Sequence, residues 1–72
     1  MAEVMELDAE KRAASALTAS PEFALRELKV EQAGDCLRLR GKVRRYYHKQ
    51  LAQETVRSVA KGFRLENQVQ VE

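Results

Sequence analysis

The chain contains little of several residue types, and each shortage excludes a class of protein. It has no tryptophan, one cysteine, one proline and three glycines among its 72 residues. Because Cys36 is alone, it cannot form an internal disulfide, and the fold does not depend on an oxidising compartment. No apolar run approaches the roughly 18 residues that cross a bilayer, so no transmembrane segment is expected. We expect one small domain over residues 1–72, without room for a large enclosed active site.

The N-terminal segment MAEVMELDAEKR carries acids where a secretory signal would carry bases and an apolar core. No signal peptide is therefore expected, which indicates a cytoplasmic location unless the chain is a domain excised from an envelope protein. The apolar share of 44% and the charged share of 33% are typical of a soluble globular protein.

Charge is divided unevenly along the chain. Residues 1–34 carry seven acids and four bases, whereas residues 35–72 carry four acids and nine bases. The basic half contains the stretch RLRGKVRRYYHKQ (Arg38 to Gln50), which holds six bases, two tyrosines, the one histidine and no acid. A run of this kind favours an anionic partner.

The spacing of apolar residues predicts a first helix in the acidic half. We expect it from Asp8, acting as N-cap, to Ala19, with residues 1–8 frayed. Ser20-Pro21 ends this helix, because the residue before a proline is pushed out of the helical region and proline lacks an N–H donor. The segment Phe23 to Leu28 fits either one more helical turn or the start of a strand.

Two strands follow, joined by the turn Ala33-Gly34-Asp35. Apolar and polar residues alternate on both sides of this turn, from Leu28 and from Cys36 onward, which is typical of a hairpin with one buried face. The helical period returns over Tyr46–Ala60, and Gly62 is expected to end that second helix. Alternation over Arg64–Glu72 predicts a third strand, whose inward side carries Leu65, Asn67, Val69 and Val71.

The expected fold class is therefore α+β, in the order α-β-β-α-β. A strand, helix, strand connection is almost always a right-handed crossover, which places the third strand parallel to the second. Both helices would pack on one face of a three-stranded mixed sheet. The other face would be solvated and would show Lys29, Glu31, Arg38, Arg40, Lys42, Arg64, Glu66, Gln68 and Gln70.

Three segments resemble the BON domain, a small bacterial module. They are LKVEQAGDCLRLRGKV (Leu28 to Val43), HKQLAQETVRSVA (His48 to Ala60) and LENQVQVE (Leu65 to Glu72). The most informative positions are Gly41 before Lys42-Val43 and Asn67 in an otherwise apolar row. The turn Gly62-Phe63-Arg64-Leu65 departs from the family, being one residue shorter than usual. The resemblance implies a non-catalytic binding module associated with phospholipid or envelope components.

The basic stretch supplies the candidate ligand-binding residues. Arg38, Arg40 and Lys42 are expected on the outer strand face. Around the start of the second helix lie Arg44, Arg45 and Lys49, and no Ser, Thr, Asp or Asn caps that end. Free N–H groups and the helix dipole favour a phosphate or carboxylate there.

The remaining residues of interest are expected either to pack within the fold or to form no functional site. Tyr46 is expected outward, as part of the binding set, and Tyr47 inward beside Leu51, since adjacent helical residues point about 100° apart. Structural roles are expected for Gly41, Gly62 and Asn67. His48 has no Cys or carboxylate at metal-ligand spacing, so no metal site is expected.

Several partners fit the basic stretch. The leading interpretation is an anionic phospholipid surface or an envelope-associated partner. The alternative is a protein-protein interaction or oligomerisation module that uses a sheet edge or the outer strand face. Nucleic acid ranks third, and the bases would equally suit an ordinary solvated surface. We expect no enzyme activity, cofactor or small-molecule substrate, and a monomer or weak homodimer.

Overall fold

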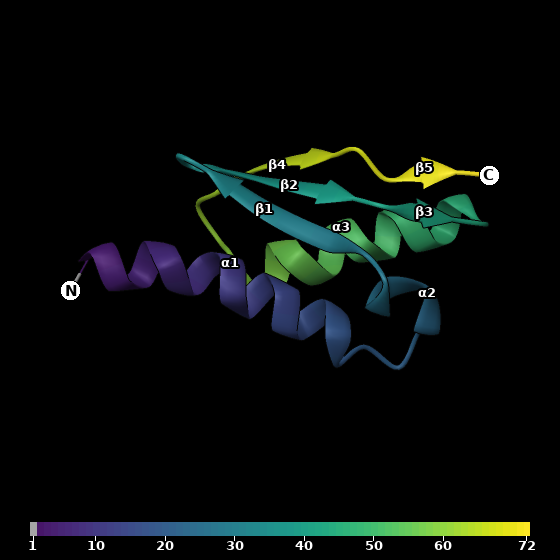
Figure 1. The fold of residues 1–72 in the computed structure, drawn as a ribbon, viewed down its shortest axis with the longest axis horizontal. Helices are drawn as coiled ribbons and strands as arrows, with labels where there is room; N and C mark the ends of the chain where they lie inside the picture. Colours follow the sequence, from purple (N-terminus) through teal and green to yellow (C-terminus); the bar gives the residue numbers. More distant parts are fainter. Residues whose placement is uncertain (1) are drawn as a thin grey trace.

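The computed structural model describes the backbone of residues 2–72 and the side chains of residues 9–72. Its elements are α1 (Ala2–Thr18), α2 (Phe23–Arg26), β1 (Lys29–Ala33), β2 (Cys36–Arg40), β3 (Lys42–Val43), α3 (Tyr46–Val59), β4 (Arg64–Asn67) and β5 (Gln70–Val71). Strand β2 lies in the centre of a three-stranded sheet, antiparallel to β1 and parallel to β4 (Figure 1). The α+β class and the mixed three-stranded sheet are thus confirmed.

Helix α1 begins earlier than the sequence predicted. It starts at Ala2, so Asp8 lies inside the helix and is not its N-cap. The segment before Asp8 is rich in Ala, Glu, Met and Leu, which are strong helix formers, and this propensity extends the helix toward the N-terminus. The fraying expected for residues 1–8 stays a prediction, since Met1 and the side chains of residues 2–8 lie outside the part of the chain that the structure describes.

The chain turns at Ser20-Pro21 and then forms the short helix α2 in the segment whose structure the sequence left open. The Ser20 hydroxyl accepts a hydrogen bond from the N–H of Glu22 at 3.1 Å, and the Ser20 carbonyl accepts one from Arg26 Nε at 2.9 Å. Leu25 of α2 is fully buried. The segment therefore packs one helical turn onto the core before the sheet begins.

The second and third expected strands are each divided in two. Strands β2 and β3 flank Gly41, whose φ is 138°, and β4 and β5 flank residues 68–69. Parallel pairing continues across both breaks, because Gln68 N–H donates to the Leu39 carbonyl and Gln70 N–H to the Gly41 carbonyl, each at 2.9 Å. The result is one bent ribbon, whose β3–β5 half contacts α3.

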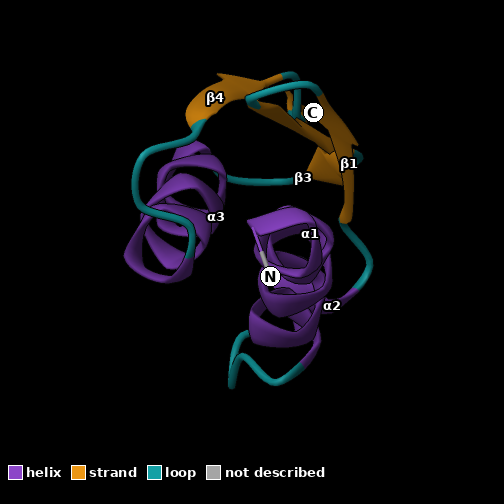
Figure 2. Cartoon of the chain, turned by 90° about the vertical axis from the view of Figure 1, so that its left-hand side faces the viewer, coloured by secondary structure: helices purple, strands orange, loops and turns teal. Residues whose placement is uncertain are grey.

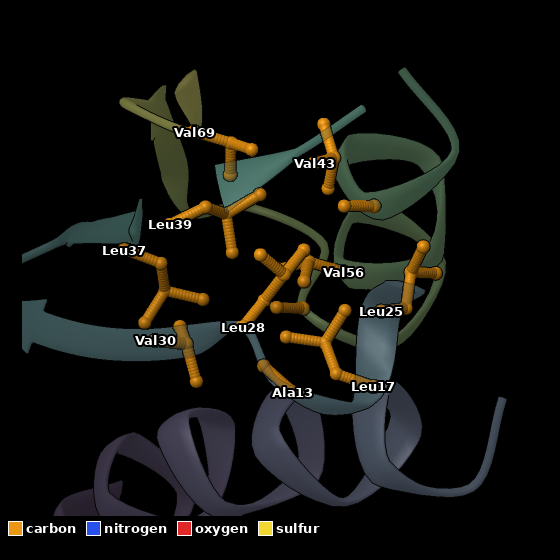
Figure 3. Close-up of a cluster of buried hydrophobic side chains, with 12 residues drawn as sticks. Ala13, Leu17, Leu25, Leu28, Val30, Leu37, Leu39, Val43, Val56 and Val69 are labelled. Atoms are coloured by element: carbon orange, nitrogen blue, oxygen red, sulfur yellow. The ribbon is translucent and has the colours of Figure 1, made fainter. Parts of the chain in front are cut away.

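The core fills the space between the sheet and the helices, which lie on one side of it (Figure 2). Figure 3 shows how side chains from both long helices, α2 and the strands converge there. The cluster comprises Ala13, Leu17, Leu25, Leu28, Val30, Leu37, Leu39, Val43, Ala52, Val56, Ala60 and Val69. All nine polar residues expected on the opposite face are exposed. The alternation of the strands therefore predicted the outer face correctly.

Asn67 joins β4 to α3. Its Nδ2 donates to the Lys49 carbonyl at 2.9 Å and lies 3.2 Å from Gln53 Oε1, while its Oδ1 accepts the Val69 N–H at 3.2 Å. The side chain thus ties the strand to the first turns of α3 rather than to the turn that contains Gly62, where φ is 91°.

We expect Asn67→Ala to lower the free energy of unfolding by about 1–3 kcal/mol, because it leaves half-buried backbone groups without their hydrogen bonds. Urea denaturation followed by circular dichroism measures the change. Gln68→Ala, at the exposed neighbouring position, is the control and should shift stability by no more than about 0.5 kcal/mol. Equal losses in the two variants would contradict the role given to Asn67.

Candidate anion-binding end

The three candidate bases on the strands are each paired with a carboxylate. The pairs are Arg38 with Glu66 (Nε to Oε1, 2.9 Å), Arg40 with Glu31 (Nη1 to Oε1, 3.4 Å) and Lys42 with Glu72 (Nζ to Oε2, 3.4 Å). Exposed pairs of this kind stabilise a fold by only about 0–1 kcal/mol each. Each carboxylate offsets the charge of its own base, so Arg38, Arg40 and Lys42 each attract an anion less strongly than an unpaired base would.

The start of α3 differs, because its bases have no carboxylate partner among the described side chains. Arg44 and Arg45 are exposed and Lys49 is half-buried. Arg45 occupies the N-cap position with an extended backbone (φ −128°, ψ 142°), makes no side-chain cap hydrogen bond, and no acid lies in the first turn. Positive charge therefore gathers where the helix dipole is also positive.

Backbone amides at this helix start are left open as well. The N–H groups of His48 and Lys49 both donate to the Arg45 carbonyl. Those of Tyr46 and Tyr47 precede the first helical hydrogen bond, and no acceptor for them occurs among the described residues. Such amides are available to water or to an external anion.

Exposed aromatic side chains lie at the same end of the molecule. Tyr46 and Tyr47 are 62% and 61% exposed, and Phe23 of α2 is 77% exposed. In Figure 1, α2, the first turn of α3, β3 and β5 share the right-hand end, and α3 contacts the other three elements. Val71 of β5, predicted to face inward, is 43% exposed there. The end is thus both basic and apolar.

The inward side chain at the start of α3 is His48, and the prediction for Tyr47 was wrong. The His48 side chain is only 17% exposed, and its Nε2 lies 3.0 Å from Glu22 Oε1. His48 precedes the fully buried Ala52 and Val56 by four and eight residues, so it continues their face of the helix. Extending that face backward by one turn would have found His48 from the sequence.

A groove of about 290 Å³ lies between α2 and the turn that leads into α3. Its lining comprises Ala24, Glu27, Lys42, Val43, Arg44, Arg45 and His48. Lys42 also lines a second groove, on the outer sheet face, together with Arg40, Gly41, Gln68 and Gln70. The strand bases and the helix-start bases therefore meet at Lys42. Neither groove includes Arg38.

Phe23 is the functional candidate that the sequence did not single out. Its ring is covered on one side by the Arg26 guanidinium, whose carbon lies 4.5 Å from the ring centre. In the segment EFALREL an apolar Phe followed by Ala and Leu suggests a core residue. Phe23 begins α2 and lies outside the core, whereas Leu25 is buried, and the sequence pattern does not determine which of these apolar residues faces the core.

Within the part of the chain that the structure describes, no helix is long and apolar enough to cross a membrane. The described side chains also include no group of three His, Cys, Asp or Glu residues close enough to hold a metal ion. No protein-family model matches the chain, and no curated protein matches it in sequence. The resemblance to the BON domain therefore stays a prediction.

Proposed function

We propose that this protein is a non-catalytic module that binds anionic phospholipid surfaces through one end. This membrane-binding end consists of α2, the start of α3, and β5. The observation that carries the proposal is that α2 and the start of α3, which share one end of the molecule (Figure 1), carry both exposed aromatic side chains (Phe23, Tyr46, Tyr47) and bases without a described carboxylate partner (Arg44, Arg45). Both features favour binding to an anionic membrane surface.

The energetics of an interface favour this combination. Each Lys or Arg near an anionic surface contributes about 1 kcal/mol, which falls off within a Debye length. Tyrosine places an apolar ring and a polar tip at headgroup level, and burial of a Phe side chain contributes about 1.5–3 kcal/mol. Either contribution alone gives weak binding, whereas the two together give stable peripheral attachment.

We propose further that the domain is of the BON type, with its helices on one face of the sheet. Supporting this are the bend at Gly41 and the contact of Asn67 with α3, since these are the two positions on which the resemblance most depends. Because Arg38 and Arg40 are each paired with a carboxylate, the proposed binding residues are Arg44, Arg45 and Lys49.

Co-sedimentation with phospholipid vesicles tests the proposed function. We expect the bound fraction to rise with the content of anionic lipid and to fall when salt is raised from low to moderate concentration. Vesicles of neutral lipid are the control and should retain little protein. Absence of binding to every vesicle composition would refute the proposal. A steep salt-dependent shift of single-stranded RNA in its place would favour nucleic acid as the anionic partner.

A further inference from the structure

The sheet has two edges, and α1 covers one of them. At the β1 edge, the Gln32 N–H points away from β2 and donates to Glu10 Oε1 of α1 at 2.8 Å. Because α1 also contacts β1, a further strand could not pair there without displacing the Glu10 carboxylate. A carboxylate on an outward amide is one way in which proteins protect an edge strand.

The β4 edge is open over four residues. The N–H groups of Arg64 and Gln68 donate to carbonyls of the β2 segment, so even-numbered amides of this strand face β2. The amides of Leu65 and Asn67 therefore point away from the sheet, and no acceptor for them occurs among the described residues. Beyond Asn67 the edge closes, since the Val69 N–H is taken by Asn67 Oδ1.

We propose that this open edge pairs with β4 of a second copy of the chain, antiparallel and centred on Leu65. Leu65 then faces Leu65 of the second copy, and the two exchange both backbone hydrogen bonds. Arg64 faces Glu66 of the second copy, and Glu66 faces its Arg64. Both side chains are exposed on the outer sheet face. A two-fold interface of this kind is self-complementary, and its opposite charges lie directly across from each other.

The charges on β4 favour this register over the neighbouring registers. Any other antiparallel register must be shifted by two residues, because only then do the outward amides of the two β4 strands still pair. Shifting one way places Glu66 opposite Glu66 of the second copy, and shifting the other way places Arg64 opposite Arg64. Only the register centred on Leu65 brings opposite charges together. Because β4 has four residues, the interface is small, and the dimer forms only at high protein concentration.

Sedimentation velocity of the full chain, from low-micromolar to millimolar concentration, tests the proposal. We expect the sedimentation coefficient of the unchanged protein to rise with concentration. Arg64→Glu and Glu66→Arg each place like charges across the interface, so each variant alone should remain monomeric. An equimolar mixture of the two variants restores opposite charges and should associate again, while circular dichroism checks that both are folded.

The equimolar mixture distinguishes loss of the dimer interface from structural changes within each variant chain. Glu66→Arg also removes the contact with Arg38, but mixing two variants cannot repair a contact inside either of them. A protein that remains monomeric at every concentration would overturn the proposal. The open β4 edge would then be available to pair with an extended segment of a different protein. Single variants that dimerise as the unchanged protein does would overturn the register, and with it the proposed pairing.

Discussion

Gly41→Ala is expected to lower the free energy of unfolding by about 2–6 kcal/mol, from two costs of about 1–3 kcal/mol each. The first is backbone strain, because a φ of 138° is rarely adopted by residues with a side chain. The second is steric, because a Cβ at this position would lie 2.6 Å from Leu28 Cδ2 in the core. For so small a domain this is a large part of the total stability. Thermal and urea denaturation measure it.

Gly34→Ala is the matched control for this variant. Gly34 also has a positive φ, of 63°, but a Cβ there would meet nothing within 4 Å. Its replacement should therefore cost only about 1–2 kcal/mol, from the left-handed backbone alone. If the two alanine variants were equally stable, the close approach of Gly41 to Leu28 would have no energetic role.

The bend at Gly41 matters for the proposed function as well as for stability. It divides β2 from β3 and leads the chain to Val43, which is buried, and then into α3. Lys42, Arg44 and Arg45 thereby come to line one groove beside α2. A variant that remains folded but straightens this ribbon would separate these bases, so fold and site depend on the same residue.

Arg44→Glu combined with Arg45→Glu is expected to weaken binding to anionic vesicles by at least about a hundredfold. The double change alters the charge of the end by four units, and each unit is worth about 1 kcal/mol at an anionic surface. Stability should not fall, because acids at a helix N-terminus are favoured by about 0.3–1 kcal/mol. Vesicle co-sedimentation together with thermal denaturation would measure both quantities.

Lys11→Glu combined with Arg12→Glu provides the matched control. These two bases are also adjacent and exposed, but they lie on α1, away from the membrane-binding end. The control changes the net charge of the chain by the same amount. We expect it to bind vesicles within a few-fold of the unchanged protein. An equal loss in both double variants would mean that net charge, rather than this end, governs binding.

Much of the fold could be predicted from periodicity alone. Alternation located the hairpin and the exposed outer face, and the helical spacing located α3 to within one residue. These features repeat over many residues, so each position supports the others. The start of α1 was missed because Asp8 has the chemistry of a cap, while continued helix propensity before it extended the helix.

The candidate site was less predictable, because it depends on single residues and on register. The pairing of Arg38 with Glu66 joins positions 28 residues apart and follows only from the parallel register of β2 and β4. The inward direction of His48 could have been found by extending the buried face of α3 backward, but the exposure of Phe23 beside the buried Leu25 could not. The sequence pattern therefore located the basic stretch. Only the structure shows that the strand bases are paired with carboxylates, whereas the bases at the helix start have no described carboxylate partner.

Paramagnetic broadening by a lipid-phase spin label in anionic bicelles, read at each backbone amide by NMR, tests the membrane-binding end most directly. We predict the strongest broadening at Phe23, Tyr46 and Tyr47, whose side chains would enter the headgroup region. The amide of Gly34, in the turn at the opposite end of the sheet (Figure 1), should remain sharp. Strongest broadening at Gly34, or equal broadening at both ends, would contradict the proposed orientation.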